Sequence, residues 1–223
     1  MLEDSINHEY IIQYIRDTIP KNDGLLKEME EYAAENHVPI VHPEVAKFIV
    51  VMAMMNNPLN ILEIGTAIGY SAILLSQALK PGGKIITIER YEKMIQIAQQ
   101  NIKKSNLDNT ISIMEGEAEQ ILPALEGEFD YIFVDAAKGQ YMEFLPHCLR
   151  LLKPGGILVS DNVLYKGMIA TDELVIRRKK TIVKRLRTYL NTICNHPQLE
   201  STIIPIGDGV AISYKVGSGE VML

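Results

Sequence analysis

The pattern of apolar and polar positions changes near residue 57. Before that point apolar residues recur at helical spacing, first over residues 6–15. A second helix is predicted to follow Asp23, a typical N-cap residue, and Pro43 at a first-turn position opens a third. Residues 1–57 are therefore predicted to form a helical segment that packs on the same domain as the rest of the chain.

From residue 58 to residue 217 short β-rich runs alternate with helical stretches. Five of these runs are apolar: Ile61–Ile64, Lys84–Glu89, Ile111–Met114, Tyr131–Asp135 and Ile157–Asp161. Five buried strands separated by helices are typical of a parallel sheet covered on both faces. Sheets of this kind bind ligands at the carboxyl ends of their strands.

The last third of the chain has a different pattern. A long helix is predicted over residues 172–195, followed by two strands, Ser201–Ile206 and Val210–Lys215, that Gly207-Asp208-Gly209 joins as a hairpin. Two Lys-Pro-Gly-Gly segments, residues 80–83 and 153–156, are predicted as turns before strands. The predicted fold class is α/β, a doubly wound, mostly parallel seven-stranded sheet with a terminal antiparallel hairpin. Residues 218–223 are expected to form a tail.

Composition indicates a single globular domain in a reducing compartment. The 223 residues are 47% hydrophobic, enough for one domain with a sizeable core. Cys148 and Cys194 are the only cysteines, which excludes a disulfide framework and a metal–thiolate cluster. Residues 1–10 lack the apolar stretch of a signal peptide, and the longest apolar run, residues 48–55, is too short to cross a bilayer. We expect a cytoplasmic protein that does not bind membranes.

The ends of the first three strands carry candidate cofactor residues. The first strand leads into Glu63-Ile64-Gly65 and then Gly69, and the second ends at Glu89, an acid suited to hydrogen bonding with a ribose diol. The glycine spacing is not the dinucleotide fingerprint, and Glu63 has the wrong charge for a pyrophosphate. A cofactor with a ribose and a cationic tail, such as S-adenosylmethionine, fits better. Small Ala118 after the third strand leaves space for an adenine.

The fourth and fifth strands end in candidate metal ligands. Asp135 ends one strand and Asp161-Asn162 ends the next, so neighbouring strands would bring all three together. Two carboxylates and an amide oxygen suit Mg²⁺, Mn²⁺ or Ca²⁺ rather than zinc. Lys138, one turn after Asp135, is a candidate general base or orienting donor. Each candidate also has an ordinary structural explanation: the glycines could simply form a turn, the aspartates could cap helices, and Lys138 could be a solvated lysine at the start of a helix.

These motifs together resemble the metal-dependent class I O-methyltransferases, which include the catechol and caffeoyl-CoA enzymes. The resemblance covers the chain from about residue 30 onward and makes residues 58–217 the S-adenosylmethionine-dependent methyltransferase domain. It implies cofactor contacts for six side chains or backbone positions: Glu63, Gly65, Ser71, Glu89, Ala118 and Asp135. It also implies Mg²⁺ ligation by Asp135, Asp161 and Asn162, and catalytic roles for Asp135 and Lys138. The N-terminal helices are similar to those that build a homodimer in this family.

One difference from the catechol enzymes concerns the acceptor. Their aromatic residues between the metal aspartate and the lysine are replaced here by Ala136 and Ala137, which leaves room for a wider acceptor. Four phrases, at residues 37–40, 135–141, 161–167 and 204–209, resemble a bacterial group that converts 5-hydroxyuridine to 5-methoxyuridine at the tRNA wobble position. In that group the position of Val41 also lines the cofactor site. We therefore expect tRNA O-methylation, with small catechol-like or caffeoyl-CoA-like acceptors as the alternative.

The net charge of −6 argues against nucleic-acid binding until its distribution is considered. Residues 177–187 contain seven basic residues and no acidic one, which leaves 15 basic and 28 acidic residues elsewhere. Six of the seven lie opposite the apolar face of the predicted helix and would contact the phosphates of a tRNA anticodon loop: Arg177, Arg178, Lys180, Lys184, Arg185 and Arg187. A solvated amphipathic helix is the plain alternative. An NAD-dependent oxidoreductase and a non-catalytic RNA-binding module remain as other functional hypotheses.

Overall fold

The computed structural model describes residues 6–217, so residues 1–5 and the predicted tail at 218–223 lie outside it. Three helices come first: α1 (Glu9–Thr18), α2 (Gly24–Asn36) and α3 (Pro43–Asn56). Pro43 is the first residue of α3, a position whose N–H makes no hydrogen bond within a helix, so proline is tolerated there. Residues 37–42, called the strap below, connect α2 to α3 without helix or strand.

The strands form one seven-stranded sheet, as predicted. They are β1 (Asn60–Ile64), β2 (Lys84–Glu89), β3 (Ile111–Glu115), β4 (Phe129–Val134), β5 (Leu152–Ser160), β6 (Leu199–Ile204) and β7 (Val210–Lys215). Their order is β3-β2-β1-β4-β5-β7-β6, and β7 runs antiparallel to the two strands beside it, β5 and β6, whereas the other strand pairs are parallel. From β1 the chain adds β2 and β3 on one side of the sheet and then β4 and β5 on the other side. Sheets of this type bind ligands at the point between β1 and β4 where this change of side occurs.

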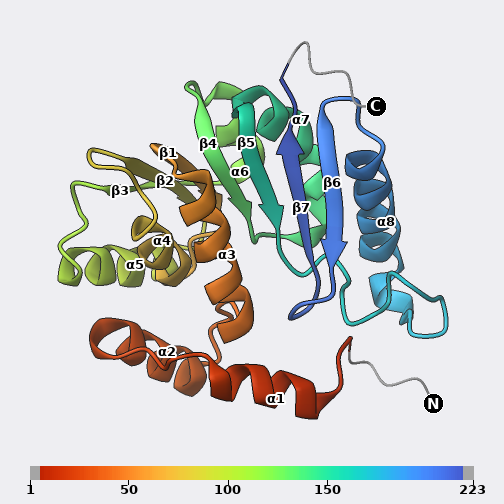
Figure 1. Cartoon of the computed structure of the whole chain (residues 1–223), viewed down its shortest axis with the longest axis horizontal. Coiled ribbons are helices and arrows are strands. Elements are labelled where there is room, and N and C mark those ends of the chain that lie inside the picture. The colour runs from red at the N-terminus through yellow and green to blue at the C-terminus, as the bar shows by residue number, and fades with distance from the viewer. Residues whose placement is uncertain (1–5, 218–223) are drawn as a thin grey trace.

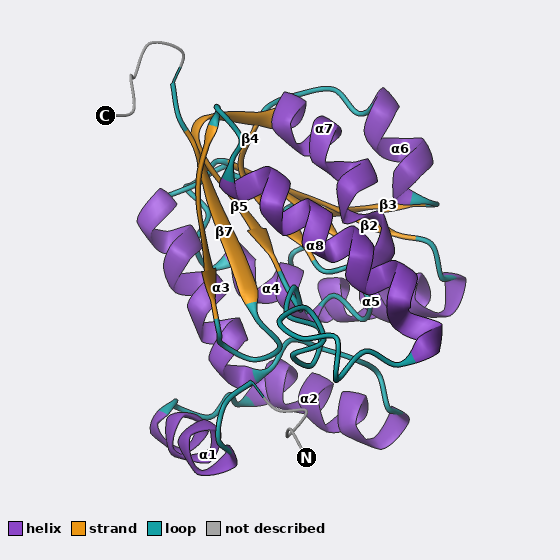
Figure 2. Cartoon of the chain, turned by 90° about the vertical axis from the view of Figure 1, so that its right-hand side faces the viewer, coloured by secondary structure: helices purple, strands orange, loops and turns teal. Residues whose placement is uncertain are grey.

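Helices cover both faces of the sheet (Figure 2). One layer contains α3, α4 (Tyr70–Ser76) and α5 (Glu92–Lys104), and the other contains α6 (Ala118–Ala124), α7 (Tyr141–Leu151) and α8 (Lys180–Cys194). Short 3₁₀ turns, η1 (Lys138–Gln140) and η2 (Arg177–Lys179), precede α7 and α8. Helices α1 and α2 lie beyond the carboxyl ends of β4 and β5 (Figure 1). Within the described residues no helix is long and apolar enough to span a membrane.

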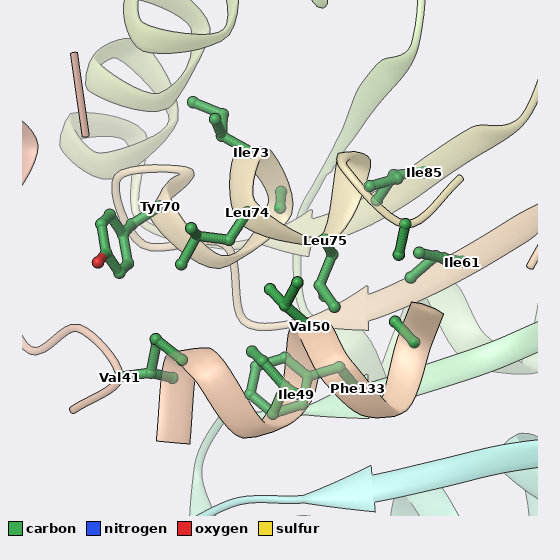
Figure 3. Packing of buried hydrophobic residues seen from close by; sticks show 14 of the residues in the cluster. Val41, Ile49, Val50, Ile61, Tyr70, Ile73, Leu74, Leu75, Ile85 and Phe133 are labelled. Atoms are coloured by element: carbon green, nitrogen blue, oxygen red, sulfur yellow. The ribbon is translucent and has the colours of Figure 1, made fainter. Parts of the chain in front are cut away.

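Two apolar clusters, one on each face, hold the layers together. Figure 3 shows the first, where Ile49 of α3 packs beside Phe133 of β4 and Leu75 of α4. Each of these side chains is completely buried. Burying one such side chain contributes roughly 1.5–3 kcal/mol, so this cluster fixes α3 and the strap that precedes it against the sheet.

Two predicted boundaries are wrong. Residues 153–156 lie inside β5, which begins at Leu152 and slips register against β4, whereas residues 80–83 form a turn as predicted. The helix predicted over 172–195 begins only at Lys180. The Arg187 guanidinium donates to the carbonyl of Ile169 and to Asp172, which folds the preceding segment back along α8 instead of letting it extend the helix.

Candidate active site

A cavity of about 550 Å³ lies at the carboxyl ends of the first five strands. Its walls are the segments that follow β1 to β5, together with strap residues 38–42. Helices α1 and α2 lie beyond this edge of the sheet (Figure 1). The volume is within the range of small-molecule and cofactor pockets, which is roughly 300–1,000 Å³.

The turn after β1 brings backbone to the cavity wall. Gly65 has φ +108°, and a Cβ atom there would lie 2.1 Å from the carbonyl oxygen of Asp135. Only glycine therefore allows the end of β1 to pass this close to the end of β4. Gly69, with φ +85°, is the N-cap of α4, and Ser71 in the first turn of that helix also lines the cavity.

Glu89 is held by backbone groups on both sides of it. Its Oε2 accepts from the N–H of Ala67 at 2.9 Å, and its Oε1 accepts from the N–H groups of Arg90 and Tyr91 at 2.9 and 3.0 Å. The carboxylate lines the cavity, as its predicted role at a ribose requires. It also braces the glycine turn, a role that sequence reasoning missed because Ala67 is distant along the chain.

Glu63 is not among the residues that line the cavity, so its predicted cofactor contact stays a prediction. It is fully buried, accepts from the hydroxyl of Thr87 at 2.5 Å, and keeps one carboxylate oxygen without a hydrogen-bond partner in the described part of the chain. Burial raises the pKa of Glu63 to about 7, against the lowering effect of the Ser71 and Thr87 hydroxyls. A cation bound nearby would stabilise its ionised form.

The Glu63→Gln variant should remove a pH-dependent destabilisation of the fold. Because the folded-state pKa of about 7 is above the unfolded value, ionisation of Glu63 destabilises the fold progressively as pH rises from 4.5 to 7. Urea unfolding should show the variant gaining on the order of 3 kcal/mol relative to wild type between pH 4.5 and 8. Parallel stability curves for the two proteins would contradict this assignment.

The three predicted metal ligands line the same cavity. Asp161 is 2% exposed, and its Oδ1 accepts from the N–H of Asn162 at 2.7 Å. Burial and the charge of Asp135 raise the pKa of Asp161 to about 7. Within residues 6–217 no three His, Cys, Asp or Glu side chains gather as a metal-binding group, so the candidate ligands are two carboxylates and an amide. A buried carboxylate that is repelled by a second, partly exposed carboxylate is an arrangement that a bound divalent cation would stabilise.

Lys138 lines this end of the cavity, and Tyr141 is buried behind it. The Lys138 Nζ lies 2.7 Å from Asp135 Oδ1 at the start of η1. The buried Tyr141 hydroxyl lies 3.2 Å from the carbonyl of Val134 and 3.0 Å from that of Asp161, so it ties the ends of β4 and β5 together. Sequence reasoning missed Tyr141, although an aromatic residue one turn after the lysine is a readable signal.

Of the remaining predicted residues, some line the cavity and the predicted tRNA contacts do not. Val41 and Ala118 line the cavity, and Ala136 and Ala137 form a wall of small side chains beside Lys138. The predicted tRNA contacts lie outside the cavity lining as described. Two of them make contacts within the chain, since Arg185 donates to the carbonyl of Gly139 at 2.9 Å and Arg187 holds the segment before α8. The other four are exposed: Arg177, Arg178, Lys180 and Lys184.

Comparison with known proteins gives consistent matches. A family model described as O-methyltransferase matches residues 16–216. A catechol O-methyltransferase of Niastella koreensis is 38% identical over 213 residues, covering 92% of this chain and 96% of that protein. A Staphylococcus aureus structure provisionally described as a caffeoyl-CoA O-methyltransferase superposes with a TM-score of 0.86 at 35% identity, covering 93% and 100% of the two chains. A Bacillus cereus O-methyltransferase in complex with SAH gives a TM-score of 0.82 at 29% identity, covering 92% and 97%.

Proposed function

The chain belongs to the O-methyltransferase family, and from that premise we propose that it methylates a hydroxyl group that has a second oxygen on the adjacent carbon. The methyl donor is S-adenosylmethionine and the metal is Mg²⁺, with Mn²⁺ or Ca²⁺ as possible substitutes. The observation that carries the proposal is the convergence of Asp135, Asp161, Asn162 and Lys138 at one end of a cofactor-sized cavity. Membership of this family removes the NAD-dependent oxidoreductase hypothesis.

The cavity fits S-adenosylmethionine in shape and charge. The backbone beside Gly65 allows close approach, Glu89 offers a carboxylate for a ribose diol, and Ala118 leaves space for a base. Glu63, fully buried two residues before Gly65, adds a carboxylate that favours a cationic group nearby. Structures such as that of the Bacillus cereus relative in complex with SAH support the same cofactor.

The acceptor end fits a hard divalent cation. Asp135, Asp161 and Asn162 supply oxygen donors, and the mutual repulsion of the two carboxylates favours a cation between them. When bound, the cation lowers the pKa of the acceptor hydroxyl and the cofactor provides an electrophilic methyl group. A molecule with two adjacent oxygens suits this donor set, because it can chelate one cation.

The chain itself positions the reactants and handles the proton. Lys138, held at 2.7 Å by Asp135, stands where it can accept the hydroxyl proton or orient the resulting oxyanion. Tyr141 fixes the two strand ends that carry Asp135 and Asp161, so the donor set does not have to reorganise. Strap residues 38–42 form a further part of the cavity wall.

Two acceptor classes satisfy this chemistry, and the relatives favour the small one. Catechol and caffeoyl-CoA both appear in the names of similar proteins. The second candidate is 5-hydroxyuridine at the tRNA wobble position, whose hydroxyl lies beside a carbonyl oxygen. A specific observation favours it: the exposed basic residues Lys180 and Lys184 belong to the helix that packs on η1, which carries Lys138. The small side chains of Ala136 and Ala137 also leave room for a nucleoside.

Acceptor competition separates the two candidates. The purified protein is given S-adenosylmethionine, Mg²⁺ and either catechol or tRNA that carries unmethylated 5-hydroxyuridine, and nucleosides and small products are quantified by mass spectrometry. Methylated catechol with unchanged tRNA supports the small acceptor. Conversion of 5-hydroxyuridine to 5-methoxyuridine at a higher kcat/KM supports tRNA.

Reversing two charges on α8 tests the tRNA candidate further. In the Lys180→Glu/Lys184→Glu variant, methylation of tRNA should fall about tenfold or more at physiological salt, because phosphate contacts supply most sequence-independent affinity. Methylation of catechol should not change, since neither lysine lines the cavity. The matched control, Lys103→Glu/Lys104→Glu on α5, reverses two exposed lysines on the opposite layer. Equal tRNA activity in both variants would contradict the tRNA contact.

We also propose that two copies of the chain form a homodimer. Two of the N-terminal helices expose large apolar side chains, with Tyr10 and Tyr14 on α1 at 71% and 74% exposure and Met55 on α3 at 74%. Apolar surface of this kind is typical of protein interfaces. Light scattering should give twice the chain mass for wild type and a smaller mass for a Tyr14→Glu/Met55→Glu variant. A wild-type monomer at micromolar concentration would contradict the proposal.

A further inference from the structure

The loop that follows β5 has an unusual backbone. Asn162, Tyr165 and Lys166 have φ angles of 54°, 48° and 56°, and Gly167 follows at 75°. Left-handed conformations are unfavourable for residues with a Cβ atom and persist only where the surroundings impose them. Three non-glycine residues of this kind within five positions indicate that another part of the chain holds the loop in place.

The turn between β6 and β7 provides these contacts. The N–H of Val163 donates to the carbonyl of Gly209 at 2.9 Å, and the N–H of Leu164 donates to the carbonyl of Asp208 at 3.0 Å. The N–H of Lys166 donates to the Asp208 side chain, at Oδ1, over 2.5 Å. The carboxylate therefore holds the loop at Lys166, one of its left-handed residues.

Close packing makes the turn a rigid support. A Cβ atom on Gly209 would lie 2.3 Å from Cγ of Leu164, so glycine is needed for the loop to lie directly against the turn. A Cβ atom on Gly207 would lie 2.6 Å from Val45, a buried residue of α3. The turn is thus fixed against the core on one side and holds the loop on the other.

We propose that Asp208 is a positioning residue that sets the orientation of Asn162. This inference rests on the proposed function, because it concerns the amide donor of the proposed cation site. Asn162 precedes Val163, the first loop residue that the turn holds, and it is itself left-handed. When the carboxylate is removed, the loop relaxes toward ordinary φ angles and carries the Asn162 amide away from Asp161.

The test measures cation binding instead of turnover. Mn²⁺ serves as the probe, and its binding to the full-length protein is followed by electron paramagnetic resonance, with S-adenosylmethionine affinity measured separately by calorimetry. In Asp208→Ala, Mn²⁺ affinity should fall about 10–100-fold, the range seen when partners of metal ligands are removed. Cofactor affinity should change less than about twofold, because Asp208 does not line the cofactor cavity.

Two further variants separate positioning from general stability. Asp208→Asn keeps an oxygen that accepts from the N–H of Lys166 and should retain Mn²⁺ affinity within about threefold of wild type. Asp130→Ala is the matched control, since the Asp130 carboxylate also accepts backbone N–H groups, from Leu59 and Asn60, at the opposite edge of the sheet. It should lower the melting temperature without changing Mn²⁺ affinity.

The outcomes distinguish this inference from the proposed function. Unchanged Mn²⁺ affinity in Asp208→Ala, or an equal loss in Asp208→Asn, overturns the positioning role while the cation site stands. Absence of Mn²⁺ binding by the wild-type protein overturns both. Hydrogen exchange gives a readout without any cation: the amides of Leu164 and Lys166 should exchange faster in Asp208→Ala and at the wild-type rate in Asp130→Ala. If Asp208→Ala does not fold, the Asp208→Asn measurements still decide, because a tenfold loss there contradicts the inference.

Discussion

Replacing Lys138 with methionine is expected to lower kcat/KM for methyl transfer by about 10²–10⁴-fold, the usual contribution of a positioned proton acceptor or donor. Methionine keeps the length of the side chain and removes the ammonium group that lies 2.7 Å from Asp135. The loss should appear mainly in kcat, since Lys138 acts on the acceptor hydroxyl and the remainder of the cofactor cavity is unchanged. S-adenosylmethionine affinity, measured by calorimetry, should stay within a few-fold of wild type.

The control for this substitution is Lys153→Met. Lys153 forms a similar ion pair, 3.0 Å from Asp130, with side-chain exposures of 29% and 22% against 22% and 24% for the Lys138–Asp135 pair. It lies at the amino end of the sheet, so its loss should affect stability and leave turnover unchanged. A Lys138→Met enzyme that keeps more than a tenth of wild-type kcat would show that Lys138 does not handle the proton.

Gly65→Ala should have the largest effect on the cofactor end of the cavity. The new Cβ atom would lie 2.1 Å from the carbonyl oxygen of Asp135, so one of the two strand ends must move. A displacement near 1 Å at a reacting centre costs about 10² in rate, and here it would shift both Asp135 and the cofactor wall. We expect kcat/KM to fall by about 10²-fold or more, with a matching loss of cofactor affinity in calorimetry.

Gly127→Ala separates the clash from backbone strain. Gly127 has φ +110°, nearly the same as Gly65 at +108°, but a Cβ atom there would meet nothing within 4 Å. Both variants should lose the roughly 1–3 kcal/mol that a strained φ costs, which thermal unfolding would show. Only Gly65→Ala should lose activity, and similar kinetics for the two variants would refute the close-approach argument.

The site residues that sequence alone identified share one property. Glu89 ends a recognisable apolar strand and Asp135 and Asp161 each follow one, and the carboxyl ends of parallel strands meet at one edge of the sheet. Their convergence is therefore a consequence of strand periodicity and requires no knowledge of side-chain packing. The seven-stranded fold was predictable for the same reason.

The features that sequence reasoning missed depend on contacts between distant segments. The position of Glu63 near the end of β1 suggests a cavity residue. In the structure it is fully buried and accepts a hydrogen bond from Thr87 on the neighbouring strand β2. Arg187 sets the start of α8, because it donates to Ile169 and Asp172 in the segment before the helix. Local helix propensity does not predict such a contact between distant residues. Asp208 reads as an ordinary hairpin turn residue until its contact with Lys166 is known.

The central claim is that oxygen ligands at the ends of β4 and β5 hold a divalent cation that activates one of two adjacent acceptor oxygens. The most direct measurement is transfer of the labelled methyl group of S-adenosylmethionine to catechol, to phenol and to 5-hydroxyuridine-containing tRNA, with Mg²⁺ or with EDTA. We predict transfer to catechol or to the tRNA, none to phenol, and complete loss in EDTA and in Asp135→Ala. Transfer that persists in EDTA, or that uses phenol as well as catechol, would contradict the account.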